Sequence, residues 1–447
     1  MKFFRKIVFI LLPAFVFSLT GCNKKKTEIK TTLTIDPVEI EMYEDDYALV
    51  KAETNSTKSI TYSSQNSDVV SVNSSGVLLA KNAGKTYVNA SVEYLNASCY
   101  VTVKPITEKT EDYIRFEKSL FVIGLNDAST ENVIAPTYYH AGEAVGGKSF
   151  VYSSSNEEIA NVSANGSISV KTSGTTSIVV TCDSVTANVI LDVYDIVIRT
   201  TSDWEDMLKT TQNKNARFYL DNDLDFTDVQ YVYYSDFDHK LMGFFEGNYH
   251  TVSNITMKTN DLVQSIFGYA SVFSVMNIRF INVKFTSSVK NGGLFSSLLQ
   301  HYSEDGVNQI TGQSVIRNVL CDFIFSDVVS CVIADRFYGA NVDYVYVKAR
   351  NVAGTALRES DTYLMAYSYY TWFGTSHFID VIGLVEKGSI TKEVKNADPS
   401  DTIYYPDTIT EVKTNVAASL IEANYLASLS FDSNVWNIRP NELPSFN

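Results

Sequence analysis

An internal repeat in the first half of the chain constrains the fold more than any other feature. The segment 62–72, Tyr-Ser-Ser-Gln-Asn-Ser-Asp-Val-Val-Ser-Val, returns at 152–162 as Tyr-Ser-Ser-Ser-Asn-Glu-Glu-Ile-Ala-Asn-Val, an offset of 152 − 62 = 90 residues. The same offset pairs Gly76 with Gly166 and Val103 with Val193. Two copies of one domain are the simplest explanation of such a repeat.

Each copy shows the pattern of short β-strands. Apolar residues alternate with Ser, Thr and Asn in short runs, and clusters that contain Gly or Asn-Ser separate these runs. Alternation with a period of two predicts strands that bury one face, and regularly spaced turns between them predict a sandwich. Long segments with helical periodicity are scarce across all 447 residues, so an all-β fold class is expected.

These residues resemble the bacterial immunoglobulin-like domain, group 2. The resemblance lies in an aromatic-Ser-Ser-x-Asn core, a Gly followed by an apolar residue, and a Gly-Thr-Thr start to a late strand. The first copy departs from the last motif at Lys85 and Tyr87, although its spacing is intact. The resemblance implies two tandem Ig-like β-sandwiches, at 33–104 and 112–194.

The second half, 196–447, shows a different pattern. A short helix is expected near Ser202, and several strands after it carry an Asn or Asp near their middle. These residues are 23 to 41 positions apart, which suits the coils of a solenoid in which stacked side chains bond one another. They are Asn254, Asn277, Asn318, Asp343 and Asp380.

Segments near 215–300 resemble GLUG-type right-handed β-helix proteins of the bacterial surface. The matching segments are Tyr219 to Phe226, Gly243 to Val252 and Gly292 to Phe295. The resemblance implies a right-handed parallel β-helix as the C-terminal domain. A second sandwich or a propeller remains an alternative for 196–447.

The N-terminus has the pattern of an exported lipoprotein. Cationic residues precede an apolar run from Ile7 to Leu19, and Leu19-Thr20-Gly21-Cys22 resembles a bacterial lipobox. This resemblance implies a signal peptide at 1–21, a lipid on Cys22 and a solvated tether at 22–32. It also implies attachment to the cell membrane or the outer membrane, outside the cytoplasm. The alternative is an ordinary secretory signal that happens to end beside a cysteine.

Charge and cysteine spacing exclude several classes of function. The net charge of −15 argues against nucleic acid as a partner. No cysteine pair has C-x-x-C spacing, so Cys99, Cys182, Cys321 and Cys331 are expected to be buried apolar residues. A disulfide between Cys321 and Cys331 stays open. No cofactor and no metal site are expected.

Two groups of charged residues are candidates for a chemical role. Asp221, Asp223 and Asp225 have the spacing of the first calcium-loop ligands, but Phe226 and Val232 stand where that loop needs Gly and Glu. The solvated face of a strand is favoured there. A polysaccharide lyase or glycoside hydrolase would need aligned charges, and the candidates are Asp335, Arg336, Lys348, Arg350, Arg358 and Glu359. The motifs name no catalytic residue, and binding is favoured over catalysis.

Aromatic residues crowd one stretch of the C-terminal domain. Alternation along a strand places members of such a stretch on both faces, so a core role is favoured over an exposed platform. The platform would serve a glycan or a surface protein. The candidate ligand-binding residues are Tyr363, Tyr367, Tyr369, Tyr370 and Trp372. The expected function is a lipid-anchored protein whose Ig-like stalk presents a β-helical head for adhesion, and the alternative is a glycan-active enzyme.

Overall fold

A computed structural model provides the coordinates. It describes residues 31–351, apart from 57–59, 93, 110, 128–131, 210–214, 232–239, 258–262, 300, 304–308, 312–313, 327 and 338–340, and then the segments 362–363, 366–369, 377–385, 411–414, 436–437 and 445–446. Met1–Thr31 forms a separate unit from Thr32–Asn447. Cys22 and the signal sequence lie outside the described residues. No helix of the described part has the length and apolar character that crossing a bilayer requires.

The first copy of the repeat forms a β-sandwich around its own core. One sheet has the order β2-β9-β8-β5, and β3-β7-β6 and β1-β4 lie against it. Its core includes Val88, Cys99 and Val101, none of which is exposed. The strands are β1 (Leu33–Asp36), β2 (Glu39–Tyr43), β3 (Tyr47–Leu49), β4 (Lys51–Thr54), β5 (Thr61–Ser64), β6 (Val70–Val72), β7 (Val77–Ala80), β8 (Gly84–Val92) and β9 (Leu95–Lys104).

The second copy repeats this arrangement. Its four-stranded sheet has the order β11-β18-β17-β14, in which each strand number is that of the first copy plus nine. The register repeats as well, because Val88 opposite Cys99 becomes Ile178 opposite Val189. The strands are β10 (Tyr113–Phe116), β11 (Leu120–Gly124), β12 (Pro136–His140), β13 (Glu143–Val145), β14 (Val151–Ser154), β15 (Ala160–Val162), β16 (Ile168–Val170), β17 (Gly174–Cys182) and β18 (Val185–Tyr194). A 3-10 turn, η1 (Ile106–Glu108), follows the first copy.

One glycine in each copy explains why the repeat keeps its turn. Gly76 and Gly166 have φ angles of 80° and 83°, in the left-handed region that favours glycine. A Cβ at Gly76 would lie 2.3 Å from the carbonyl oxygen of Val50, and a Cβ at Gly166 would lie 2.6 Å from that of Ile134. Close backbone approach and positive φ therefore both require glycine.

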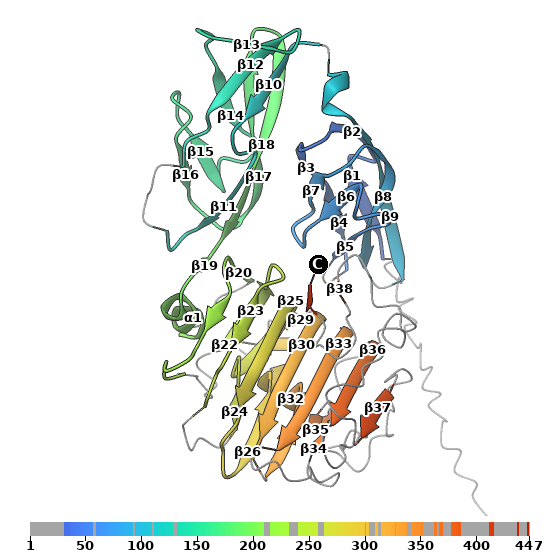
Figure 1. Cartoon of the computed structure of the whole chain (residues 1–447), viewed down its shortest axis with the longest axis vertical. Coiled ribbons are helices and arrows are strands. Elements are labelled where there is room, and N and C mark those ends of the chain that lie inside the picture. The colour runs from blue at the N-terminus through green and yellow to red at the C-terminus, as the bar shows by residue number, and fades with distance from the viewer. Residues whose placement is uncertain are drawn as a thin grey trace, which may run out of the picture. The chain divides into compact units, whose positions relative to one another are not determined.

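The described residues from Ile196 onward form a parallel β-solenoid, an architecture compatible with the predicted β-helix. Its main sheet has the order β19-β20-β22-β25-β30-β33-β36-β37 with every neighbouring pair parallel, and Figure 1 shows these strands side by side. The main-sheet strands are β19 (Ile196–Ile198), β20 (Ala216–Leu220), β22 (Lys240–Glu246), β25 (Tyr269–Lys284), β30 (Val315–Phe325), β33 (Asn341–Asn351), β36 (His377–Val385) and β37 (Glu411–Thr414).

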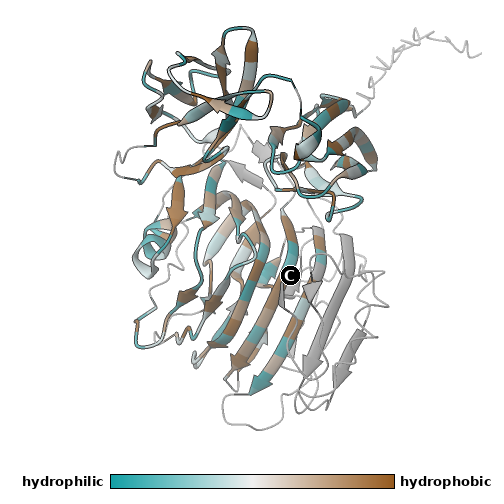
Figure 2. Ribbon diagram, turned by 45° about the horizontal axis from the view of Figure 1, so that its top comes forward, coloured by the Kyte–Doolittle hydropathy of each residue, from teal (hydrophilic) through white to brown (hydrophobic). Residues whose placement is uncertain are grey.

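Shorter strands complete the coils around one core. Strands stack as β21-β23-β25, as β24-β26-β31-β34 and as β27-β32-β35. They are β21 (Leu224–Asp225), β23 (Thr251–Ser253), β24 (Gln264–Ser265), β26 (Lys290–Gly293), β27 (Phe295–Leu299), β31 (Val329–Cys331), β32 (Ala334–Phe337), β34 (Thr362–Tyr363) and β35 (Ala366–Tyr369). Two antiparallel hairpins are added, β28 (His301–Ser303) with β29 (Gln309–Thr311) and β38 (Trp436–Asn437) with β39 (Ser445–Phe446). Apolar segments alternate with polar ones along the solenoid strands (Figure 2).

The expected stacking of Asn side chains is confirmed at one pair and differs at others. The Nδ2 atom of Asn318 donates to Oδ1 of Asn277 at 2.9 Å. Asn254 instead accepts from Asn282, at 2.7 Å, and Asp343 accepts from Arg317, at 2.5 Å. Asn277 and Asn282 both have positive φ and lie within β25, which pairs with both β22 and β23 of the preceding coil.

The helix α1 (Thr201–Leu208) packs on the solenoid core. Thr200 and Asp203 form a capping box at the N-terminus of the helix, directly after β19. Trp204 is 1% exposed and its ring meets those of Phe226, Phe245 and Phe267. The short helix expected near Ser202 is therefore present, and its apolar face extends the core.

Candidate functional site

The second sandwich continues into the solenoid without a linker. Strand β18 ends at Tyr194 and β19 begins at Ile196, so only Asp195 separates them. The carboxylate of Asp195 accepts from the amide of Arg217 at 2.7 Å, and the amide of Asp195 donates to the carbonyl of Arg217 at 2.9 Å. A connection of one residue between two strands has few free backbone torsions. We call the residues Asn126, Asp127, Asp192, Arg199 and Arg217 and their mutual contacts the joint.

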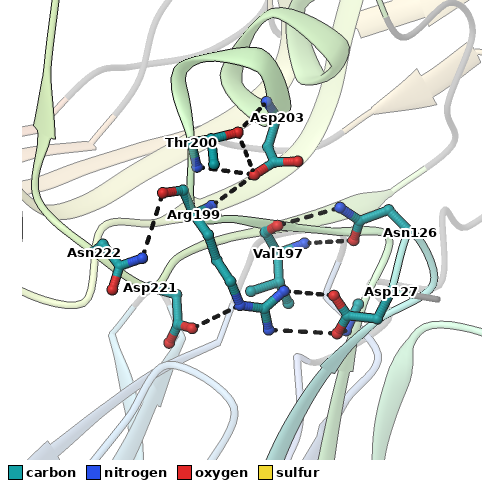
Figure 3. A network of polar contacts seen from close by, with 9 residues as sticks. Asn126, Asp127, Val197, Arg199, Thr200, Asp203, Asp221 and Asn222 are labelled. Carbon is teal, nitrogen blue, oxygen red and sulfur yellow. Dashed lines mark hydrogen bonds and ion pairs between the residues drawn. The ribbon is translucent and has the colours of Figure 1, made fainter. Parts of the chain in front are cut away.

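An arginine connects the two domains at the joint (Figure 3). Arg199 follows β19, and its Nη1 lies 2.5 Å from Oδ1 of Asp127, in the turn after β11. Its Nε donates to Asp221 of the solenoid at 2.9 Å. One guanidinium thus neutralises a carboxylate from each domain, in the planar geometry that suits arginine better than lysine.

Backbone contacts accompany this bridge. The side-chain amide of Asn126 accepts from the amide of Val197 at 3.0 Å and donates to the carbonyl of Val197 at 3.3 Å. Gly124 fits beneath it, because a Cβ there would lie 2.1 Å from the Asn126 Oδ1 atom. The turn after β11 is therefore held to β19 by both side chains and backbone.

The first sandwich contains a weaker form of the same bridge. Lys109 stands at the position of Arg199 by the repeat offset, since 199 − 109 = 90. Its Nζ lies 3.8 Å from Oδ2 of Asp46. Asp46 accepts from the amide of Tyr43 at 2.9 Å, just as Asp127 accepts from the amide of Gly124 at 2.8 Å. A cation that follows the last strand and binds this turn is therefore a property of the repeat.

A second cluster at the joint is buried. Asp192 has no exposed surface, and its Oδ1 lies 2.6 Å from Nη2 of Arg217 on β20. The hydroxyls of Tyr194 and Thr175 donate to Asp192 at 2.8 and 2.7 Å. The guanidinium also lies 4.7 Å from the centre of the Tyr194 ring, a cation–π contact. Burial raises the pKa of Tyr194 well above its usual range, so its hydroxyl stays a donor.

A loop of the first sandwich reaches the same cluster. Ser75 accepts from Nη2 of Arg217 at 2.8 Å, and Asn73 donates to Asp192 at 3.4 Å. Nearby, Glu246 of β22 is 3% exposed and accepts from Asn277 at 2.9 Å. Burial raises the pKa of Glu246, which opposes its ionisation.

The carboxylates of the joint are engaged by guanidinium groups, hydroxyls and amides. No group of three His, Cys, Asp or Glu side chains among the described residues is placed to hold a metal. What the joint can do is fix the direction in which the solenoid leaves the second sandwich.

The candidate aromatic residues lie in the least described part of the chain. Tyr363 belongs to β34, and Tyr367 and Tyr369 belong to β35. Tyr369 stands in register with Phe337, which has no exposed surface. Tyr370 and Trp372 lie outside the described residues. Their role as a binding platform stays a prediction.

Each of the three aspartates that have calcium-loop spacing contacts a different side chain in the structure. Asp221 binds Arg199, Asp223 accepts from His250 at 3.0 Å and Asp225 accepts from Asn254 at 2.9 Å. The hydrogen bond from Asn254, followed by that from Thr227, lowers the pKa of Asp225. The three carboxylates therefore serve separate contacts between coils.

The charged residues that an enzyme of this fold would need do not form one cluster among the described residues. They form separate ion pairs. Arg350 donates to Asp322 at 3.0 Å, and Asp335 binds Lys290 at 3.3 Å. Lys348 stands in register with Asp322. Arg358 and Glu359 lie outside the described residues. Cys321 is a buried free thiol, so the disulfide to Cys331 that the spacing left open is not formed.

No motif in the sequence points to the joint, but the two copies of the repeat differ there. At the offset of 90, Asp192 and Tyr194 replace Thr102 and Lys104 of the first copy. When only one of two copies has a carboxylate at a given position of a strand, that carboxylate indicates a contact that the other copy lacks.

Comparisons with known proteins agree with the sandwich part of the fold. A family model for the bacterial Ig-like domain (group 2) matches residues 127–193. The chain therefore contains a bacterial Ig-like domain in its second copy, as the motifs predicted. The search of curated proteins found no match.

Several solved structures are similar at low identity. Human protocadherin-24 EC1-2 is 16% identical, with 36% of this chain and 97% of that chain covered and a TM-score of 0.15. The S-layer protein SbsC, domains 5-6, is 14% identical, with 36% and 96% covered and a TM-score of 0.19. Mouse cadherin-23 EC22-24 is 14% identical, with 36% and 64% covered and a TM-score of 0.15.

Proposed function

We propose that this chain is a lipid-anchored cell-surface protein in which two Ig-like sandwiches form a stalk and the β-solenoid is the presented head. The lipid is attached to Cys22, and the head binds a glycan or a surface protein without turning it over. The bacterial Ig-like match at 127–193 supports a place at the cell surface.

The observation that carries the proposal is the joint. A stalk that presents a head must fix the direction of the head, and a linker of free torsions would not do so. Here β18 passes into β19 through one residue, and Arg199 and Arg217 tie both sides together. Enzymes with mobile domains place flexible segments at such boundaries, whereas this boundary is cross-linked by charge pairs.

Anchoring is tested by replacing Cys22 with Ser. Acylation takes place on the sulfur atom, so the variant should leave the membrane fraction or stay unprocessed. The control is Cys99→Ser, because Cys99 is a buried residue of the first sandwich and has no part in anchoring. Unchanged membrane retention of a processed Cys22→Ser protein would remove the lipoprotein part of the proposal.

Binding by the head is tested with the full chain on a glycan array, together with an assay for release of reducing sugar. Alanine at Tyr369, Tyr370 and Trp372 should weaken binding and leave the melting temperature unchanged if these residues form a platform. If the same changes unfold the head, the aromatic residues belong to the core. Depolymerisation of any polysaccharide by the wild-type chain would instead establish the lyase or hydrolase alternative.

A further inference from the structure

Two tyrosines lie side by side on the outer face of the first sandwich. Tyr87 of β8 stands directly opposite Tyr100 of β9, and their ring centres are 5.0 Å apart at an angle of 49°. Tyr87 is 44% exposed, whereas its neighbours Thr86 and Val88 face the core and are buried. The pair therefore presents aromatic surface to solvent on a sheet.

Polar pairs continue the same face toward the β8–β9 hairpin. Ser98 donates to the side-chain oxygen of Asn89 at 2.7 Å, and Ser91 donates to that of Asn96 at 2.6 Å. Each asparagine uses its oxygen in this bond, which leaves its NH2 group for another acceptor. Tyrosine rings beside Ser and Asn are also the composition that antibody binding loops use, because rigid rings give contact area and small polar groups give adaptable hydrogen bonds.

The charges of this face cancel. Its other half holds Glu39, Glu41, Lys85 and Lys104, two of each sign, and Lys104 binds Glu41 at 2.5 Å. The whole chain has a net charge of −15, so a neutral face is a local property. An uncharged polymer is therefore better matched to this surface than a nucleic acid or an acidic peptide.

The second copy of the repeat shows that the fold does not require these rings. Ser177 and Ile190 stand at the positions of Tyr87 and Tyr100, and they too are directly opposite in the register. Ile190 is 1% exposed, so the corresponding face of the second sandwich is covered there. The first copy thus has an aromatic pair, with Tyr87 exposed, where the second copy has a serine and a buried isoleucine.

We propose that this face binds an extended neutral polysaccharide. Sugar rings would stack on Tyr87 and Tyr100, and the hydroxyls of the next residues along the polymer would bond Asn89, Ser98, Ser91 and Asn96. The face is open and follows the strands, which suits a linear polymer better than a small molecule enclosed in a cavity. This site lies in the stalk and is separate from the head, so it does not depend on what the head binds.

The test is retention of the full chain by insoluble cellulose, chitin, xylan and mannan, followed by affinity electrophoresis with the soluble form of the polymer that retains it. We expect Tyr87→Ser/Tyr100→Thr to weaken binding at least about tenfold, since aromatic anchors dominate such surfaces. Tyr139→Ser is the matched control, because Tyr139 stacks on Tyr113 with ring centres 4.8 Å apart, on another sandwich. It should bind like the wild type.

Two further variants separate this site from its alternatives. Asn89→Ala/Asn96→Ala should weaken binding about threefold to tenfold with an unchanged melting temperature, which a purely structural tyrosine pair would not produce. Alanine at Tyr369, Tyr370 and Trp372 of the head should leave unchanged the difference in retention between the wild-type chain and Tyr87→Ser/Tyr100→Thr. Failure of the wild-type chain to bind any of the four polymers, or equal binding by the Tyr87/Tyr100 variant, would overturn the proposal, whereas loss of retention only with the head variant would assign the glycan to the head.

Discussion

The Nη2 atom of Arg217 lies 2.6 Å from Oδ1 of Asp192, across the boundary between the second sandwich and the solenoid. The side chain of Asp192 is fully buried and that of Arg217 is 11% exposed. A buried carboxylate needs a partner, because its desolvation is costly and only hydrogen bonds and an opposite charge offset it. The solenoid is thereby tied to one buried aspartate of the sandwich.

The first prediction is that Arg217→Met destabilises the chain by about 3–5 kcal/mol, because Asp192 stays buried without its cation. Chemical denaturation followed by tryptophan fluorescence measures the effect, since Trp204 lies in the solenoid core. Arg115→Met is the control, because Arg115 is exposed on β10, and it should change stability by less than about 0.5 kcal/mol. Adding Asp192→Asn to Arg217→Met should restore part of the loss. Equal effects of the two arginine variants would show that the pair does not stabilise the joint.

The second prediction concerns Arg199, whose side chain is 36% exposed. Its ion pairs are screened by solvent, so Arg199→Gln should cost only about 0.5–1 kcal/mol of global stability. Local opening of the joint should still increase, and the amide of Val197, which donates to Asn126, should exchange with deuterium several-fold faster. Lys209→Gln removes a cation from α1 outside the joint and should leave this amide unchanged. An unaltered rate at Val197 in Arg199→Gln would mean that Arg199 does not hold the joint closed.

Local sequence patterns predicted the fold well, because turns and strand alternation depend on residues that are close together in the sequence. The offset of 90 residues predicted two sandwiches, and both copies have the same sheet order and register. The positive φ at Gly76 and Gly166 follows from the turn that the repeat contains. The parallel stacking of coils was predicted from mid-strand Asn residues, of which Asn277 and Asn318 do bond each other.

The joint could not be predicted in the same way, because its partners are far apart in the sequence. Arg199 binds Asp127 from 72 residues away, and Arg217 binds Asp192 from 25 residues away. The pattern of Asp221, Asp223 and Asp225 suggested one site, but coil geometry gave each carboxylate a different partner. Alternation along a strand fixes which face a residue occupies, and it does not fix which coil lies beside it.

The third prediction concerns pH and Glu246. Burial raises the pKa of this carboxyl above its usual value, so the native state holds a proton that the unfolded state releases. Its contribution therefore favours folding at low pH, and stability falls as pH rises from the unfolded pKa, about 4.3, through the raised native value. Glu246→Gln keeps an oxygen for Asn277 and carries no charge, so it should remove this slope. The gain of the variant over wild type should be small at pH 4 and larger at pH 7.

Thermal unfolding of both proteins across this pH range measures the difference. Asp225, whose pKa is lowered by Asn254, makes a contribution to stability with the opposite pH dependence. Because Asp225 is present in both proteins, this contribution cancels from their difference. Asp225→Asn is the matched control, and its difference from wild type should grow in favour of the wild type as pH rises through the lowered native pKa to about 3.9, and stay constant at higher pH. A Glu246→Gln protein that is less stable than wild type by a constant amount at every pH would contradict the prediction.

The last prediction concerns Trp204, which closes the solenoid core from α1. Its indole N–H donates to the hydroxyl of Tyr231 at 3.0 Å, and that hydroxyl donates to the carbonyl of Ile266 at 2.7 Å. Trp204→Ala removes ring contacts and leaves a cavity, so it should cost about 3–5 kcal/mol. Tyr231→Phe keeps the ring and removes only the hydroxyl, which leaves a buried donor and a buried acceptor without partners and should cost about 1–3 kcal/mol. Urea denaturation followed by circular dichroism compares the two variants. If Tyr231→Phe has no effect, water replaces the hydroxyl, and if Trp204→Ala costs no more than Tyr231→Phe, α1 is not part of the cooperative core.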